Sequence, residues 1–426
     1  MFLFVRKYFS PFVHQDEELS FLQIFKPMYY LVSAVGLFPS SIKFPTGKTL
    51  TVVYKSTTIN LACTLLMATT VCVSFSLHML ELSINGRQEL NNFEEDDITL
   101  TNYITNLVLM LIFSVIAFIS ALKNRSLYIK ILNEMAECWA VLPNSVGSNG
   151  ILGPLRVQVN CVVLGSLLLM LIVQLVVTCT ADLPKSKIAL IAMTFNLPEM
   201  LQFTVLAFYF VMIVMPVAIL KNIEEHFGMI FDVRRVCDVE NDFVGLPLGS
   251  SLASLRQLRG VYARALAVKR QVNAAFQAPL LLITALSFHT IVTVAHGIYH
   301  VLTYQNNFTT HDVVEECFWV VYQLIKFHTL GYSSALLELQ ANKIGSTLYK
   351  ISTHINEQIT QYKSSADVNK EIKFNLEVQH FASMMKYQDT KITIYGLFPL
   401  KSSLLFTAVA SAASFIVILV QFDDGK

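Results

Sequence analysis

The chain has 426 residues, of which 54% are hydrophobic and only 14% are charged, with a mean hydropathy of +0.54. This composition excludes a set of water-soluble domains and indicates an integral membrane protein. The 31 basic and 30 acidic residues nearly cancel to a net charge of +1, so total charge indicates no partner and we expect no nucleic acid to bind.

Residues 1–56 are predicted to form a cytoplasmic N-terminal segment. The starting sequence MFLFVRKYFS lacks the apolar stretch and small-residue cleavage site of a signal peptide. Residues 21–38 are apolar, but Lys26 and Pro27 interrupt them. We therefore expect a re-entrant or interfacial helix here rather than a full span.

Seven later segments are apolar and long enough to cross a hydrocarbon core of roughly 30 Å as helices. They are residues 57–80, 99–121, 157–180, 193–220, 277–303, 313–337 and 402–422. The sixth is the weakest because it contains Lys326 and His328. The sequence thus predicts an all-α membrane protein with seven transmembrane helices. Six of them lie in 57–337, cytoplasmic anchor helices follow in 338–401, and the last span and a short extracellular tail occupy 402–426.

The basic residues outside the spans lie almost entirely in the N-terminal segment and in the loops after the second, fourth and sixth spans. By the positive-inside rule, this predicts a cytoplasmic N-terminus and an extracellular C-terminus. The sequon Asn307-Phe308-Thr309 then lies outside, so Asn307 is a predicted glycosylation site.

Two of the cytoplasmic loops have a helical pattern. Apolar residues recur at three- and four-residue steps in 251–276 and in 338–390, with charged residues between them. These helices are expected either to extend the spans inward as one packed bundle or, in addition, to join subunits to each other.

Polar and aromatic side chains within membrane spans tend to face a cavity or the protein interior, because their exposure to lipid is costly. In the outward halves of spans two to six the candidates for a small amphipathic ligand are Tyr103, Asn106, Gln174, Thr178, Asn196, Glu199, Gln202, His296, Tyr299, Trp319, Tyr322 and Gln323. Interhelical packing is the alternative for this set, and Glu199 could instead pair with Lys326. No catalytic, cofactor or metal motif is present, so we expect no enzyme and no cofactor.

The last span, SSLLFTAVASAASFIVILVQF, has small residues in its middle, which permit close approach between helices. Such a helix is suited to packing around an axis. Gln421 and Phe422 lie at its outer end, with Ile418 one turn below on the same face and Asp423 and Asp424 beyond.

The stretch GLFPLKSSLLFTAVASAASFIVILVQF resembles the carboxy-terminal signature of the insect gustatory receptors, which ends in Thr-Tyr, five apolar residues and Gln-Phe. Ser414 and Phe415 stand here in place of Thr and Tyr, which leaves the subfamily open. The resemblance implies a homotetrameric, ligand-gated cation channel in the plasma membrane of a chemosensory neuron, related to insect odorant receptors. Four copies of the last span would line one pore.

In that arrangement Ile418 and Phe422 would form apolar rings that close the pore by dewetting, and Gln421 would form a polar ring. For Gln421 the alternative is an anchor at the membrane interface. Asp423 and Asp424 would concentrate cations at the outer mouth or form a solvated tail. The permeant ions would be Na⁺, K⁺ and Ca²⁺, and the gating ligand a small-molecule tastant.

The candidate ligand residues are more often aromatic and amide than carboxylate, which favours a bitter or other plant compound over a sugar such as fructose. Two other classes are weighed against the channel. A G-protein-coupled receptor requires the opposite orientation, which the distribution of basic residues opposes. A secondary transporter should show an internal repeat and paired broken helices, which we do not find.

Overall fold

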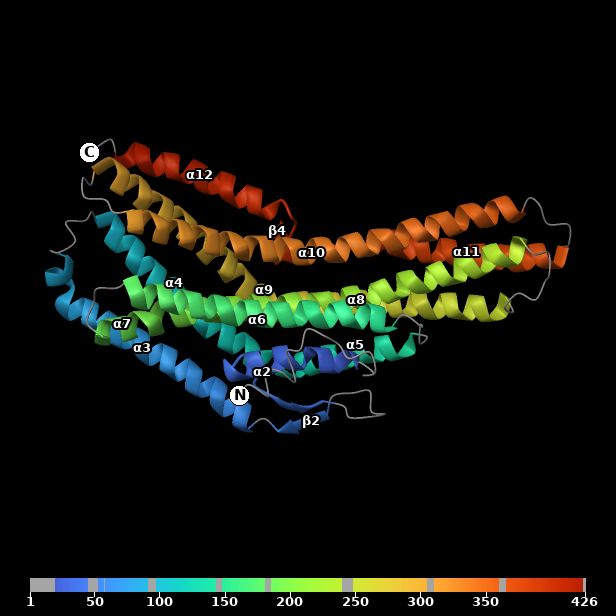
Figure 1. The fold of residues 1–426 in the computed structure, drawn as a ribbon, viewed down its shortest axis with the longest axis horizontal. Coiled ribbons are helices and arrows are strands. Elements are labelled where there is room, and N and C mark those ends of the chain that lie inside the picture. Colours follow the sequence, from blue (N-terminus) through green and yellow to red (C-terminus); the bar gives the residue numbers. More distant parts are fainter. Residues whose placement is uncertain are drawn as a thin grey trace.

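The computed structural model describes residues 20–44, 53–56, 58–90, 97–142, 148–180, 185–239, 248–304, 310–359 and 365–423. Most of these residues are helical, and the molecule is an elongated helical bundle (Figure 1). The long helices are α3 (Thr58–Leu90), α4 (Asp97–Lys123), α5 (Arg125–Val141), α6 (Ser148–Thr180), α8 (Leu197–Val239), α9 (Leu248–Tyr304), α10 (Thr310–Ile359), α11 (Ser365–Tyr387) and α12 (Leu404–Asp423). The short helix α7 (Lys185–Ile191) leads through the π-helix η2 (Ala192–Asn196) directly into α8.

The N-terminal part of the described chain is folded into the bundle. The 3-10 helix η1 (Phe21–Phe25) continues into α2 (Lys26–Ala34), where Pro27 sits in the first turn and its missing N–H costs no hydrogen bond. Phe25 and Met28 are fully buried, and the two helices pack against α6 and α8. The strands β1 (Ser41–Lys43) and β2 (Val53–Ser56) follow as an antiparallel pair.

Among the described residues, five helical segments are long and apolar enough to cross a membrane. They are Thr58–Ile84, Thr101–Lys123, Gly150–Leu175, Ser186–Gly228 and Leu252–Tyr299. The described part of α12 contains a shorter apolar stretch, Leu404–Phe415. The sixth predicted span lies within α10 but does not reach this level of apolarity, because Gln323 and Lys326 lower its mean hydropathy although both are fully buried. Seven spans therefore stay a prediction.

Helix α8 is the centre of the bundle, with 94% of its most apolar stretch buried. It packs against α4, α6, α9 and α10, which surround it. Tyr209, Met212 and Ile213 are among its residues with no exposed surface. The remaining helices are therefore arranged around α8.

Helices α8, α9 and α10 continue as single helices to the end of the molecule where α11 packs against α9 and α10 (Figure 1). At this end the ring of Phe381 lies 5.6 Å from that of Phe227 and 5.4 Å from that of Tyr262. Arg259 Nη1 pairs with Glu377 Oε1 at 2.7 Å. The helices predicted in 251–276 and 338–390 are confirmed. They form parts of α9 and α10 and the helix α11, and these three pack together as one bundle. Their role in joining subunits stays a prediction.

A small hairpin connects α11 to α12. Strands β3 (Thr393–Ile394) and β4 (Phe398–Pro399) pair antiparallel around a turn in which Tyr395 and Gly396 have φ angles of 49° and 71°. The Leu400 N–H donates to the Ile392 carbonyl at 2.8 Å and closes the hairpin. The hairpin therefore defines where the chain turns back into α12.

Candidate functional site

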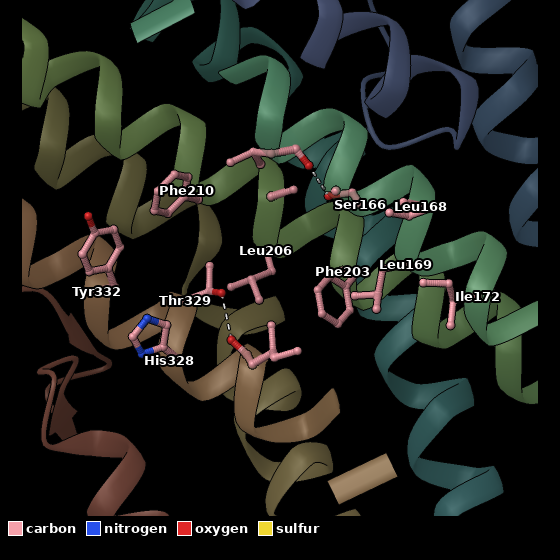
Figure 2. Close-up of a pocket in the computed structure, with 14 residues that line it drawn as sticks. Ser166, Leu168, Leu169, Ile172, Phe203, Leu206, Phe210, His328, Thr329 and Tyr332 are labelled. Carbon is pink, nitrogen blue, oxygen red and sulfur yellow. Dashed lines mark hydrogen bonds between the residues drawn. The ribbon is translucent and has the colours of Figure 1, made fainter. Parts of the chain in front are cut away.

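A groove of about 370 Å³ lies between α6, α8 and α10 (Figure 2). Its walls include Ser166, Leu169 and Ile172 from α6, Phe203, Leu206 and Phe210 from α8, and His328, Thr329 and Tyr332 from α10. These positions come from three helices that are distant in sequence. The groove is thus a product of how the bundle packs.

The lining of the groove is mostly apolar and aromatic. Figure 2 shows Phe210, His328 and Tyr332 gathered at one end, with Phe203, Leu169 and Ile172 at the other. The Tyr332 ring is stacked on both Phe210, at 6.3 Å and 12°, and His328, at 5.8 Å and 14°. Flat rings of this kind suit an aromatic or alicyclic ligand, and a few polar groups then fix its orientation.

The serine and threonine hydroxyl groups of the groove bond to their own helices. Ser166 Oγ donates to the Val162 carbonyl and Thr329 Oγ1 to the Ile325 carbonyl, both at 2.8 Å. Hydroxyls bonded in this way add little polarity to a helix surface. The His328 imidazole and the Tyr332 hydroxyl are therefore the main polar groups on the wall.

A buried ion pair lies behind the groove and joins α8 to α10. Lys326 Nζ donates to the Glu199 carboxylate, and also to Gln202 Oε1 at 2.8 Å. Gln323 Nε2 lies 3.5 Å from the second carboxylate oxygen of Glu199. Lys326 is fully buried and Glu199 is only 3% exposed. Of the two roles considered for Glu199, the structure shows the pairing with Lys326.

Aromatic rings cover this ion pair. Lys326 Nζ lies 4.9 Å from the centre of the Tyr322 ring and 5.8 Å from that of Phe203, and the two rings are 4.7 Å apart. Trp319 packs edge-on against Tyr322 at 5.5 Å. Phe203 also lines the groove, so it separates the ion pair from any occupant of the groove.

A second polar cluster involves the π-helix η2. The Tyr103 hydroxyl lies 2.9 Å from His78 Nε2, and His78 Nδ1 lies 2.8 Å from Thr194 Oγ1. Nearby, Asn196 Nδ2 donates to Gln174 Oε1 at 3.4 Å. Tyr103, Gln174 and Asn196 are thus engaged in contacts between helices. His78 is not among the residues predicted from the sequence, although an isolated histidine in an apolar span could have indicated it.

The structure places the other predicted ligand residues as follows. His296 is buried, and neither its Nε2 nor Asn106 Oδ1 has a hydrogen-bond partner among the described residues. Tyr299 is half-buried. The side chain of Thr178 and the whole of Asn307 lie outside the described residues. None of the predicted ligand residues lines the groove, although many share its three helices.

Helix α12 packs along α9 and α10 at one side of the bundle (Figure 1). Its small residues Ala408 and Ala412 are buried against Ile291, Val292 and Phe327. On the uncovered face Ile418 is 46% exposed and Gln421 is also exposed, whereas the side chain of Phe422 lies outside the described residues. The small residues therefore let α12 approach its own chain closely and leave a long apolar face open.

Comparisons with known proteins agree with this architecture. The sequence matches the family described as 7tm Chemosensory receptor over residues 25–425. Among solved structures, the insect olfactory receptor OR5 from Machilis hrabei in complex with eugenol aligns with a TM-score of 0.66 and 11% identity. That alignment covers 95% of this chain and 100% of the other. A second structure of the olfactory receptor OR5 from Machilis hrabei aligns with a TM-score of 0.61 and 14% identity. This alignment covers 93% of this chain and 97% of the other. A search of curated protein sequences finds no match.

Proposed function

The chain belongs to the 7tm chemosensory receptor family, a family of receptors and not of enzymes, and from that premise we propose that it is a tastant-gated, non-selective cation channel of the gustatory type. The open apolar face of α12 is the observation that carries this proposal. In a tetramer, the chain's own α9 and α10 would cover one side of α12, and the other side would face the pore and neighbouring copies. Ile418 and Phe422 would then form the closed gate, and Gln421 the polar ring beside it.

The proposed topology places seven spans in the plasma membrane of a chemosensory neuron, with the N-terminus inside and the C-terminus outside. The distribution of basic residues supports this orientation. The end of the molecule formed with α11 would then lie in the cytoplasm, where the exposed Arg256 and the partly exposed Arg259, both paired with Glu377, would meet water. Asn307 would be glycosylated outside, and Na⁺, K⁺ and Ca²⁺ would be the permeant ions.

The groove between α6, α8 and α10 is the proposed ligand site. Its apolar, aromatic lining favours a bitter or other largely apolar plant compound over a sugar, because sugars need many hydrogen-bond partners that these walls do not offer. The ligand would open the channel by binding the open arrangement of the subunits more tightly than the closed one.

A sugar-gated receptor is the second candidate, and one observation favours it. His296 Nε2, Asn106 Oδ1 and Gln323 Oε1 are buried polar atoms without a hydrogen-bond partner among the described residues. Buried polar atoms of this kind can accept hydrogen bonds from, or donate them to, the hydroxyl groups of a sugar. In this case the ligand would bind at one or more of these side chains and not in the groove.

The channel proposal is tested by whole-cell current from this chain expressed alone, during perfusion with sugars, plant alkaloids, glycosides and eugenol. We expect a rapid, non-selective cation current that survives blockade of G proteins. A response that requires G proteins would contradict the channel.

The ligand site is tested by filling the groove from α6. Gly165 lines the groove, and a Cβ added there meets no atom within 4 Å, so Gly165→Leu should occupy the space and abolish the response. Gly150→Leu is the matched control, because Gly150 lies exposed on the same helix, away from the groove, and an added Cβ there also meets no atom within 4 Å. An unchanged response to a plant compound in Gly165→Leu would exclude the groove, and loss of a sugar response in His296→Leu would favour the second candidate.

A further inference from the structure

Gly331 lies on α10 in direct contact with the backbone that leads into α12. A Cβ added to Gly331 would lie 2.6 Å from the Lys401 carbonyl oxygen, 3.1 Å from the Lys401 carbonyl carbon and 3.2 Å from Ser402 Cα. All three atoms belong to the main chain and cannot rotate away as a side chain can. Any residue other than glycine at this position must therefore displace the segment 401–402, which we call the root of α12.

The same turn of α10 forms part of the groove. His328, Thr329 and Tyr332 line the groove, whereas Phe327 packs with Ala408 and Ala412 of α12. Residues in a helix are about 100° apart around its axis, so Phe327 and Gly331 share one face and His328 and Tyr332 the next. This part of α10 therefore lines the groove on one side and contacts α12 on the other.

The segment that leads to the root of α12 is held by α9. Lys269 Nζ donates to the carbonyl oxygens of Asp389, at 3.1 Å, and of Lys391, and Asn273 Nδ2 donates to the Thr393 carbonyl at 2.9 Å. These bonds fix the hairpin that precedes the root. The chain is consequently fixed to α9 before the root and meets α10 at the root itself.

On the N-terminal side of this turn, α10 is attached to α8. The bonds from Lys326 to Glu199 and Gln202 lie about one and a half helical turns from Gly331. Because these bonds resist sliding of α10 along α8, an occupant of the groove would act on the turn 328–332 mainly by tilting or rotating it. A glycine contact transmits such a movement with no intervening flexible side chain.

We propose that Gly331 is a positioning residue that couples the occupancy of the groove to the position of α12. The inference rests on the proposed function, since it makes α12 the gating helix and the groove the ligand site. If Gly331 only allowed close packing, a substitution would change folding or assembly and leave the gating equilibrium of the assembled channel unaltered. Coupling and packing thus differ in what they predict for channels that reach the surface.

The first test compares Gly331→Ala with Gly345→Ala. Gly345 lies further along α10, where an added Cβ meets only the flexible end of Met385 at 3.7 Å, so it is a matched control. At equal surface expression, we expect Gly331→Ala to change the half-maximal ligand concentration or the ligand-independent current about tenfold, which corresponds to about 1.4 kcal/mol. Gly345→Ala should behave like the wild type. Coincident concentration–response curves for Gly331→Ala and wild type would overturn the coupling.

The second test keeps Gly331 and needs neither a ligand nor a current. Lys401 is exposed, so Lys401→Cys in the purified full chain can be labelled with a thiol reagent, with the parent chain measuring labelling of native cysteines. Filling the groove with Gly165→Leu should change the labelling rate of Lys401→Cys severalfold, and Gly150→Leu should not. Equal rates in the three backgrounds would overturn the coupling even if the channel responds to a tastant. A change in rate without any ligand current would instead leave the coupling standing and count against the proposed function.

Discussion

Helices α8 and α12 are both strongly apolar, but they occupy opposite positions in the molecule. Helix α8 is surrounded by other helices, and Tyr209, Met212 and Ile213 have no exposed surface. Helix α12 packs along α9 and α10 on one side, and on the other side Phe406 is 75% exposed and Ile418 46% exposed (Figure 1).

This difference shows that apolarity favours placing a helix in the membrane but does not decide its position within the bundle. A lipid tail is as apolar as a leucine, so the hydrophobic effect does not distinguish a lipid-facing helix from a central one. Small residues and polar pairs decide the contacts between helices. Helix α8 is tied to α10 through Glu199 and Lys326, whereas α12 is held through Ala408 and Ala412.

The largest effect is expected where α8 is tied to α10. Glu199→Ala leaves the Lys326 ammonium buried without its carboxylate, which should lower the free energy of unfolding by about 3–5 kcal/mol. Thermal unfolding of the purified chain in detergent measures this loss. The double variant Glu199→Ala/Lys326→Met should recover most of it, since no unpaired charge remains. A single variant as stable as wild type would show that α8 and α10 are held by apolar packing alone.

A substitution on α8 away from the ion pair should come next. Ile213 is fully buried, so Ile213→Ala should cost about 2–5 kcal/mol through lost contacts and the cavity that remains. Chemical or thermal unfolding of the same preparation provides the measurement. A cost below about 1 kcal/mol would mean that the centre of the bundle can collapse around the cavity, and the contrast with α12 would weaken.

On α12 the expected effect appears in the current and not in stability. Replacing Ile418 and Phe422 with Ala should raise the ligand-independent current severalfold, because a wider and less apolar constriction no longer excludes water. Patch-clamp recordings at matched surface expression measure this current. Unchanged basal current in a well-expressed double variant would reject these residues as the gate.

The smallest effect is expected at the exposed face of α12. Phe406→Ala should change the free energy of unfolding of the isolated subunit by less than about 0.5 kcal/mol, since the ring contacts little of its own chain. Unfolding of the subunit and of the assembled protein can be compared by size-exclusion chromatography with heating. A substantial loss seen in the assembly alone would show that a neighbouring copy covers this ring, whereas a large loss in the isolated subunit would contradict the exposed position.

Much of the fold could be predicted from the sequence. The three- and four-residue periodicity in 251–276 and 338–390 predicted helices that the structure confirms, since a repeated apolar face needs a partner surface. The pairing of Glu199 with Lys326 was one of two predicted roles. Sequence alone could not decide between them, because the distance between α8 and α10 depends on how the helices pack.

The groove could not be predicted in the same way. Leu168 and Ile325 line it and are exposed, as lipid-facing leucines and isoleucines are, so no residue type marks the site. The ligand residues predicted from the sequence were instead polar ones such as Tyr103, Gln174 and Glu199, and these contact neighbouring helices. Polar groups in a membrane must find partners, and in this chain several find them in adjacent helices.

The sequence by itself determined that the chain is a membrane protein with long apolar helices and a family-like final span, because composition and periodicity are local properties of the chain. Only the tertiary structure decided that α8 is central and α12 peripheral, that Lys326 is paired, and that Gly331 meets the root of α12. These features depend on distances between helices that are remote in sequence, and such distances are set by the packing of all the side chains together.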